Sequence, residues 1–323
     1  MATGVERDPG EITASVTPKV ARVLTIVYAN AILIPFAGEE GSLATFDIVR
    51  SNSLSHIKYL EVARFRQTPA SRCVFLHGFT QQPQMWLDLA TNLIEIFPLR
   101  CDLLFLPGHE EHAHLAPQKE TYLKDLASFM RDSHVVAYSM GARLVLWSLY
   151  AAGLTNGLLS LTLLSGHIGL QSERERRERY IHDVLLGGSL LQMSTKSYRE
   201  FLVQWNKQEI FNGREMDEKE LRLRGRAQPF GVGSSLVEYT TSLQPDISSF
   251  LGKVTFPTSF IVGSKDIKYK ELASIAHRAN PTHIDKMIID GASHDVLSAR
   301  PFEIQEKLSS TFKHFFDTYP VRS

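Results

Sequence analysis

The five residues Ala137, Tyr138, Ser139, Met140 and Gly141 place a serine after an apolar run and before a helical pattern. This context is typical of a nucleophile elbow, a tight strand-to-helix turn that lifts a serine hydroxyl above the edge of a sheet. Alanine stands where the pattern usually has its first glycine. Serine is also a preferred residue at a helix N-cap. The motif alone therefore leaves open whether Ser139 is a nucleophile or a cap.

Three further segments could complete a serine-based site. The loop at residues 77–79 (His-Gly-Phe) follows an apolar run, at a place where a loop can supply a backbone N–H to an oxyanion. Asp266 and His294 each follow a later apolar run. The order Ser139, Asp266, His294 matches the chain order expected of the α/β-hydrolase fold. In such a triad Asp266 would orient the imidazole of His294, which would take a proton from or through Ser139.

A second cluster, at residues 109–114, reads His-Glu-Glu-His-Ala-His and raises the possibility of a metal site. The spacing typical of zinc proteases would need a histidine at position 113, which is Ala113. The segment also follows Pro107 and Gly108, so we expect a loop and not one face of a helix. A solvated loop is the favoured interpretation, and we expect no metal there.

Arginines cluster at residues 173–179 and 222–226. Because the first cluster mixes both signs of charge, a solvated helix face with i,i+4 pairs is the favoured interpretation from composition. Arg176 and Arg179 would nevertheless share one face. Above a cleft, arginines would suit a substrate that carries carboxylates, because guanidinium groups pair with them in bidentate geometry.

From residue 72 onwards the chain alternates short apolar runs with longer helical patterns, which predicts parallel βαβ units in a sheet covered on both faces. The predicted strands lie at residues 73–76, 103–106, 134–137, 161–164, 259–262 and 286–289. The predicted helices lie at residues 85–96, 121–130, 142–150, 270–278 and 302–316.

The alternation stops between residues 167 and 244, where the sequence is helical and charged. We expect this segment to form a helical cap, inserted after the sixth strand, over the carboxyl edge of a mostly parallel sheet. The remaining parts would be an α/β-hydrolase core at residues 56–166 and 245–323, and an N-terminal extension at residues 1–55 whose role is open. The extension could hold leading antiparallel strands.

Bulk properties narrow the possible partners. The 323 residues carry 35 basic and 35 acidic side chains, which gives no chain-wide field for nucleic acid. The apolar run at residues 23–36 contains Asn30 and Pro35 and is shorter than the ~20 residues of a spanning helix, so strands or a short helix are favoured over membrane insertion. Two cysteines and an acidic start, unlike a signal peptide, favour the cytoplasm. The oligomeric state stays open.

The motifs together resemble a specific branch of the fold, the menaquinone-pathway synthases (MenH-type) that form 2-succinyl-6-hydroxy-2,4-cyclohexadiene-1-carboxylate. The resemblance runs from about residue 59 to the C-terminus and is carried by several short segments in register. These are residues 76–79 followed by Trp86, 106–109, 138–141 followed by Arg143, 166–171, 201–205, 244–245, 263–269 and 291–294. The combination is more specific than any one motif.

The resemblance implies a catalytic triad of Ser139, Asp266 and His294. It also implies a substrate-binding set, with Arg224 favoured over Arg226 in the second arginine cluster: Phe79, Tyr138, Met140, Arg143, Arg179, Trp205 and Arg224. The implied reaction is the elimination of pyruvate from 2-succinyl-5-enolpyruvyl-6-hydroxy-3-cyclohexene-1-carboxylate, without a cofactor. The serine–histidine pair would act there as a base that removes a ring proton.

Several positions depart from the family pattern. Ala137 and Ala142 replace glycines of the elbow, Gln81 stands where glycine is usual, and Ile168 replaces a proline. These changes indicate a divergent member of the family. Two other functions stay open: a serine ester or thioester hydrolase that acts on a small acidic substrate, and a non-catalytic binding protein with the same fold.

Overall fold

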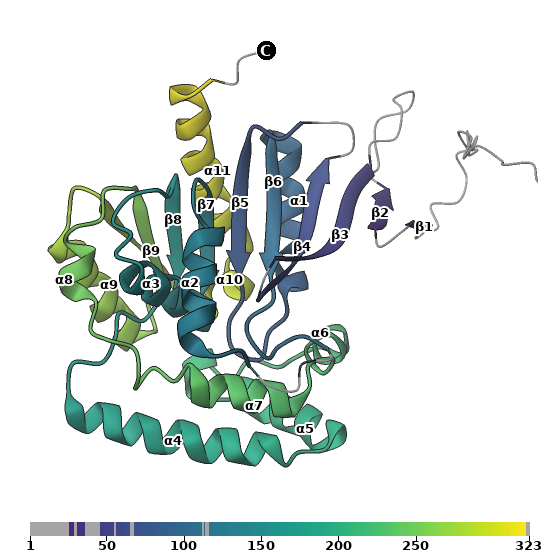
Figure 1. Cartoon of the computed structure of the whole chain (residues 1–323), viewed down its shortest axis with the longest axis vertical. Helices are drawn as coiled ribbons and strands as arrows, with labels where there is room; N and C mark the ends of the chain where they lie inside the picture. Colours follow the sequence, from purple (N-terminus) through teal and green to yellow (C-terminus); the bar gives the residue numbers. More distant parts are fainter. Residues whose placement is uncertain are drawn as a thin grey trace, which may run out of the picture.

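The sheet is the scaffold that carries the candidate site. The computed structural model describes residues 26–28, 31–35, 46–54, 56–64, 68–111, 113 and 116–320. Within them ten strands form one sheet in the order β1-β2-β3-β4-β6-β5-β7-β8-β9-β10. Helices cover both faces, and a separate group of helices lies below the carboxyl ends of the central strands (Figure 1). The predicted fold class, a mostly parallel sheet with a helical cap, is confirmed.

The strands include all six that the sequence predicts, with their ends shifted by a few residues. Their bounds are β1 Ile26–Tyr28, β2 Ala31–Pro35, β3 Phe46–Leu54, β4 Ile57–Arg64, β5 Ser71–Leu76, β6 Leu99–Leu104, β7 His134–Tyr138, β8 Ser160–Leu164, β9 Thr258–Gly263 and β10 Ile284–Ile289.

The sheet has a parallel half and an antiparallel half. Strands β5 to β10 pair in parallel. Strands β1 to β4 pair with their neighbours antiparallel, and β4 joins the parallel half through β6. The apolar run at residues 23–36 contains β1 and β2. In the part of the chain that is described, no helix has the length and apolar character needed to cross a membrane.

The helices of the core pack in two layers. The short helical turn η1 accompanies them. The bounds are η1 Pro83–Trp86, α1 Leu87–Ile96, α2 Lys119–Phe129, α3 Met140–Ala151, α8 Ser248–Leu251, α9 Ile267–Ala279, α10 Val296–Ala299 and α11 Pro301–Thr318. Buried side chains of α2, α3, α8 and α9 form one apolar cluster with the sheet, and those of α1, α10 and α11 form another on the opposite face.

The cap follows β8, which is the sixth strand counted from β3. It consists of α4 Glu173–Leu191, α5 Thr195–Asn206, η2 Glu209–Phe211, α6 Glu218–Arg224 and α7 Pro229–Glu238. Its own apolar cluster includes Leu190, Tyr198 and Leu236. Helices α4 and α7 cross closely at Gly187 and Gly233. A Cβ on Gly187 would lie 2.9 Å from the carbonyl oxygen of Gly233. The cap therefore has a small core of its own.

Candidate active site

Ser139 lies on a strained turn between β7 and α3. Its φ angle is 50°, in a region that residues other than glycine rarely adopt. The turn brings the elbow close to the loop after β5, because the N–H of Gly141 donates to the carbonyl of His77 at 3.1 Å. A Cβ on Gly141 would lie 2.6 Å from that oxygen, so glycine is required there. The Ser139 side chain makes no capping hydrogen bond, although the residue occupies the N-cap position.

The three predicted triad side chains form one hydrogen-bonded line. Ser139 Oγ lies 2.9 Å from Nε2 of His294, and His294 Nδ1 lies 2.7 Å from Oδ2 of Asp266. His294 and Asp266 are buried, whereas Ser139 is partly exposed. A carboxylate that accepts from Nδ1–H leaves the Nε2 lone pair facing the serine. The arrangement can therefore draw a proton from the Ser139 hydroxyl.

Two buried histidines hold the loop that follows β5. His77 Nε2 accepts from the N–H of Leu106, and His109 Nε2 accepts from the N–H of Thr80, both at 3.1 Å. Burial lowers the pKa of His77 well below its usual value and lowers the pKa of His109 to about 4. Both side chains are therefore neutral acceptors near pH 7.

The expectation of a solvated loop at residues 109–114 is wrong for His109. Its ring is buried because Nδ1 contacts the carbonyl of Pro107 at 3.0 Å and Nε2 receives the Thr80 N–H. Glu111 is exposed, and His112 and His114 lie outside the described residues. Across the described ranges, no group of His, Cys, Asp and Glu has the arrangement of a metal site.

Nine of the ten predicted site residues line one cavity of about 170 Å³ at the carboxyl edge of the sheet. They are Phe79, Tyr138, Ser139, Met140, Arg143, Arg179, Trp205, Arg224 and His294. The tenth, Asp266, lies behind His294. Arg226, the alternative to Arg224, is exposed and lines a different hollow. No hydrogen bond from the N–H of Phe79 or Met140 is found in the described part of the chain.

The three arginines of this cavity differ in how they are paired. Arg143 is buried and its Nη1 has no hydrogen-bond partner among the described residues. Burial, and then the nearby Arg179, lower the pKa of Arg143 to about 10, so it stays charged near pH 7. Arg179 is partly exposed and pairs with Asp183 at 2.7 Å. Arg143 therefore has a free donor for an anionic ligand.

The guanidinium of Arg224 is already held by the protein. Its Nε donates to the carbonyl of Thr80 at 3.1 Å, and its Nη2 contacts Thr80 Oγ1. Its Nη1 contacts Asn206 Oδ1 at 3.2 Å and Glu220 Oε1 at 3.0 Å. Arg224 lines the cavity, but most of its donors face protein atoms.

Sequence reasoning missed three residues beside the triad. The ring centroid of Tyr269 lies 4.4 Å from that of His294, and the ring centroid of Phe211 lies 5.8 Å from that of His294. Asp295 also lines the cavity. Asp295 could have been found as the neighbour of His294. Phe211 has no such signal, because it comes from a short turn of the cap.

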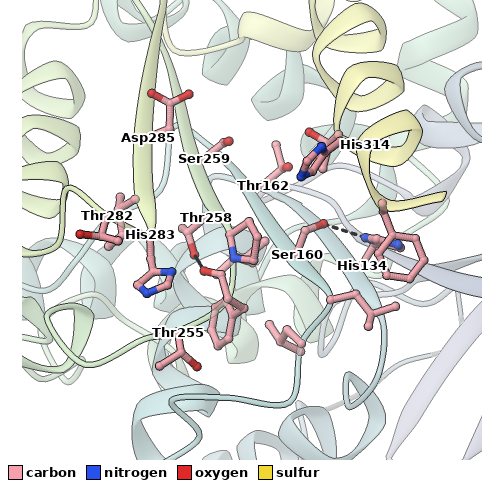
Figure 2. A pocket seen from close by; sticks show the side chains of 18 of the residues that line it. His134, Ser160, Thr162, Thr255, Thr258, Ser259, Thr282, His283, Asp285 and His314 are labelled. Carbon is pink, nitrogen blue, oxygen red and sulfur yellow. Dashed lines mark hydrogen bonds between the residues drawn. The ribbon is translucent and has the colours of Figure 1, made fainter. Parts of the chain in front are cut away.

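A second and larger cavity, of about 980 Å³, lies at the amino edge of the sheet beside α11. Figure 2 shows the hydroxyl and imidazole side chains that line it, including Ser160 and His134, which are joined by a hydrogen bond of 2.8 Å. None of the predicted site residues lines this cavity.

Comparison with known proteins places these features among named relatives. No family model matches the chain. The 2-succinyl-6-hydroxy-2,4-cyclohexadiene-1-carboxylate synthase of Citrobacter koseri is 26% identical over 251 residues, which cover 74% of this chain and 93% of the relative. The protein of the same name from Escherichia coli O9:H4 is 27% identical over 233 residues, which cover 65% and 89%.

Solved structures share the fold. MenH from S. aureus has a TM-score of 0.66 and 21% identity, and covers 81% of this chain and 99% of its own. An esterase from Thermogutta terrifontis has a TM-score of 0.61 and 17% identity, and covers 88% and 99%. The chain has the α/β-hydrolase fold, and its resemblance to the 2-succinyl-6-hydroxy-2,4-cyclohexadiene-1-carboxylate synthases is confirmed.

Proposed function

We propose that the protein is a carbon–oxygen lyase that eliminates pyruvate from 2-succinyl-5-enolpyruvyl-6-hydroxy-3-cyclohexene-1-carboxylate and forms 2-succinyl-6-hydroxy-2,4-cyclohexadiene-1-carboxylate. The name of the curated relatives supports the reaction. Within this proposal Ser139, His294 and Asp266 are the catalytic residues. The site needs no metal or organic cofactor for this chemistry.

One observation carries the proposal: the triad opens into a cavity that also holds Arg143, Arg179 and Arg224. The substrate has three carboxylates, one on the ring, one on the succinyl group and one on the enolpyruvyl group. A buried guanidinium with an unpartnered Nη1, as in Arg143, is costly without an anion beside it. A substrate carboxylate would supply that anion. A hydrophobic ester would leave the guanidinium unpaired.

The chemistry follows from the substrate and the triad. The proton at ring carbon C2 is acidic because the succinyl carbonyl adjoins it. His294 draws the proton of Ser139, and the serine oxygen removes the C2 proton. The C3–C4 double bond shifts, so that double bonds form at C2–C3 and C4–C5 while the C5–O bond breaks. Enolpyruvate leaves and becomes pyruvate by taking up a proton at carbon.

Negative charge develops on the succinyl carbonyl oxygen during proton removal. Phe79 and Met140 line the same cavity, and their backbone N–H groups would donate to this oxygen. Donors held in place beforehand stabilise such charge more than water does, because they need not reorganise. Trp205 and Phe79, whose ring centroids lie 5.2 Å apart, would cover the ring of the substrate.

The test is product analysis with purified protein. The substrate is incubated with the enzyme, and pyruvate and the cyclohexadiene are quantified by mass spectrometry. We expect the two products in equal amounts. Pyruvate formation no faster than in buffer would contradict the proposal.

Hydrolysis of a small acidic ester or thioester is the second candidate. The 2.9 Å contact between Ser139 and His294 favours it, because the same contact would activate the serine as a nucleophile. An acyl-enzyme on Ser139, seen by intact-protein mass spectrometry with an activated ester, would support hydrolysis. Cleavage of the C5–O bond without such an adduct would support the lyase.

A further inference from the structure

The loops on either side of Ser139 are joined through the cap by a continuous chain of polar contacts. On one side lies the loop after β5. Arg224, at the end of α6, holds this loop by donating to both the carbonyl and the hydroxyl of Thr80. The two residues lie 144 positions apart in the sequence. Thr80 has a φ angle of 63°, so this contact holds the loop at a conformation that threonine rarely adopts.

On the other side lies the loop that carries His294. Asp295, the next residue, is buried, and its carboxylate forms an ion pair with Nε of Arg214 at 3.3 Å. This contact is electrostatic, because Arg214 Nε makes no hydrogen bond within the described residues. The cap touches this loop at two more points. The N–H of His294 donates to the carbonyl of Ile210 at 3.1 Å, and the ring of Phe211 contacts the imidazole.

Glu220 connects the two arginines. Its Oε1 accepts from Nη2 of Arg214 at 2.6 Å and from Nη1 of Arg224 at 3.0 Å. Asn206 adds a second bridge, because its amide donates to the carbonyl of Arg214 at 2.9 Å while its oxygen contacts Arg224. Two arginines and two carboxylates give this network no net charge.

We propose that Glu220 is a positioning residue, which couples the loop after β5 to the loop that carries His294, through Arg224 and Arg214. The path runs from Thr80 through Arg224, Glu220 and Arg214 to Asp295. Neither Glu220 nor Arg214 lines the cavity. They act through Arg224 and Asp295, which do line it. The cap thereby positions both the N–H donors of the loop after β5 and the imidazole of His294. The catalytic consequence rests on the proposed function, whereas the coupling of the two loops does not.

The test is a double-mutant cycle between the two ends of the path. Thr80→Val and Asp295→Asn are near-isosteric, and an asparagine side chain can still cap α10 by accepting from the N–H of Ser298. Each single variant is expected to lower kcat for pyruvate release about tenfold, with a smaller change in KM. The double variant is expected to lower it about tenfold as well, because one break already uncouples the loops. In a Glu220→Gln background, either end variant is expected to add less than about twofold.

A second readout does not need the proposed reaction. The imidazole ¹H and ¹⁵N signals of His294 are recorded in each variant, and Thr80→Val is expected to shift them although Thr80 contacts the other loop. Shifted His294 signals without any pyruvate would overturn the proposed function and leave the coupling intact. Independent effects of the two ends, with kcat falling about a hundredfold in the double variant and His294 signals unmoved by Thr80→Val, would overturn the coupling.

Glu218→Gln is the matched control. Glu218 lies on the same helix and pairs with Arg199 and Arg222, each at 3.9 Å, but its side chain is exposed and it touches neither loop. Its replacement is expected to leave kcat and the His294 signals unchanged. Thermal unfolding of every variant separates loss of the fold from loss of coupling. Should Glu220→Gln fail to fold, the cycle between Thr80 and Asp295 still decides the question.

Discussion

Among the described residues, two serine–histidine pairs lie at opposite edges of the sheet, and the pair at the carboxyl edge has a carboxylate on the other imidazole nitrogen. Ser139 and His294 lie 2.9 Å apart at the carboxyl edge, and Ser160 and His134 lie 2.8 Å apart at the amino edge. In the first pair the other imidazole nitrogen meets Asp266. In the second pair the Nε2 of His134 is buried without a partner among the described residues.

The surroundings differ as much as the pairs. His134 packs against the rings of Phe312 and Phe315, and burial lowers its pKa to about 4. Its cavity is the larger one, yet its lysine, Lys307, is already paired with Asp285 at 3.0 Å. A Ser–His contact thus becomes a site only with an orienting carboxylate, free donors and unpaired positive charge.

Replacing the two serines gives the largest expected contrast. Ser139→Ala is expected to lower kcat by about 10³ to 10⁴, because the base loses the group through which it acts. Ser160→Ala is expected to leave kcat unchanged and to lower the free energy of unfolding by about 1 kcal/mol, through loss of one hydrogen bond. Steady-state kinetics and chemical denaturation check both. Equal loss of activity in the two variants would contradict the expected difference between the two serine–histidine pairs.

Acid sensitivity is the property that we expect the two regions to share. The folded-state pKa of His109 and of His134 is about 4, against an ordinary value of 6.5. Between these pH values the unfolded chain binds more protons, so stability falls as the pH falls from 6.5 towards 4.

Each histidine is expected to contribute about 3 kcal/mol of this loss. In His109→Gln or His134→Gln the loss should be smaller by that amount. Denaturation with urea from pH 7 to pH 4 measures it. If the free energy of unfolding changes with pH in both variants as it does in the wild type, these rings are not held neutral in the folded protein.

Arg143→Met tests whether the carboxyl-edge cavity is built for an anion. We expect kcat/KM to fall by about 10 to 100-fold, because a charged hydrogen bond to substrate is lost. We expect the free energy of unfolding to rise by about 1 kcal/mol, because a buried charge with an unpartnered Nη1 is removed. Arg177→Met, at an exposed arginine, is the control variant. Lower stability together with full activity would assign Arg143 a structural role.

The smallest effect is expected at the rim of the amino-edge cavity. Lys307→Gln removes a partly exposed ion pair with Asp285. Such pairs contribute about 0 to 1 kcal/mol, so stability should change little and kcat not at all. A clear loss of activity would show that this cavity takes part in the reaction.

Much of the fold was predictable because it depends on local patterns. The six predicted strands are continuous apolar runs, and their order fixed where Ser139, Asp266 and His294 would meet. The carboxyl ends of parallel strands share one edge, so residues distant in sequence converge there.

Other features could not be predicted, because they depend on contacts without a repeating pattern. Arg224 and Thr80, which form a hydrogen bond, lie 144 residues apart, and no periodic pattern in the sequence predicts this contact. The sequence predicts a solvated loop at His109, whereas its ring is buried against the Thr80 N–H and the Pro107 carbonyl. The pairing of Arg214 with Asp295 likewise needs the cap in place.

The most direct test of the central claim is a single-turnover experiment with substrate carrying deuterium at ring carbon C2. If Ser139 and His294 remove that proton, wild-type protein should release pyruvate more slowly from the deuterated substrate than from the ordinary one. No covalent adduct should form on Ser139, and Ser139→Ala should release almost none in the same time. Equal rates for the two substrates, with an acyl group found on Ser139, would contradict the account.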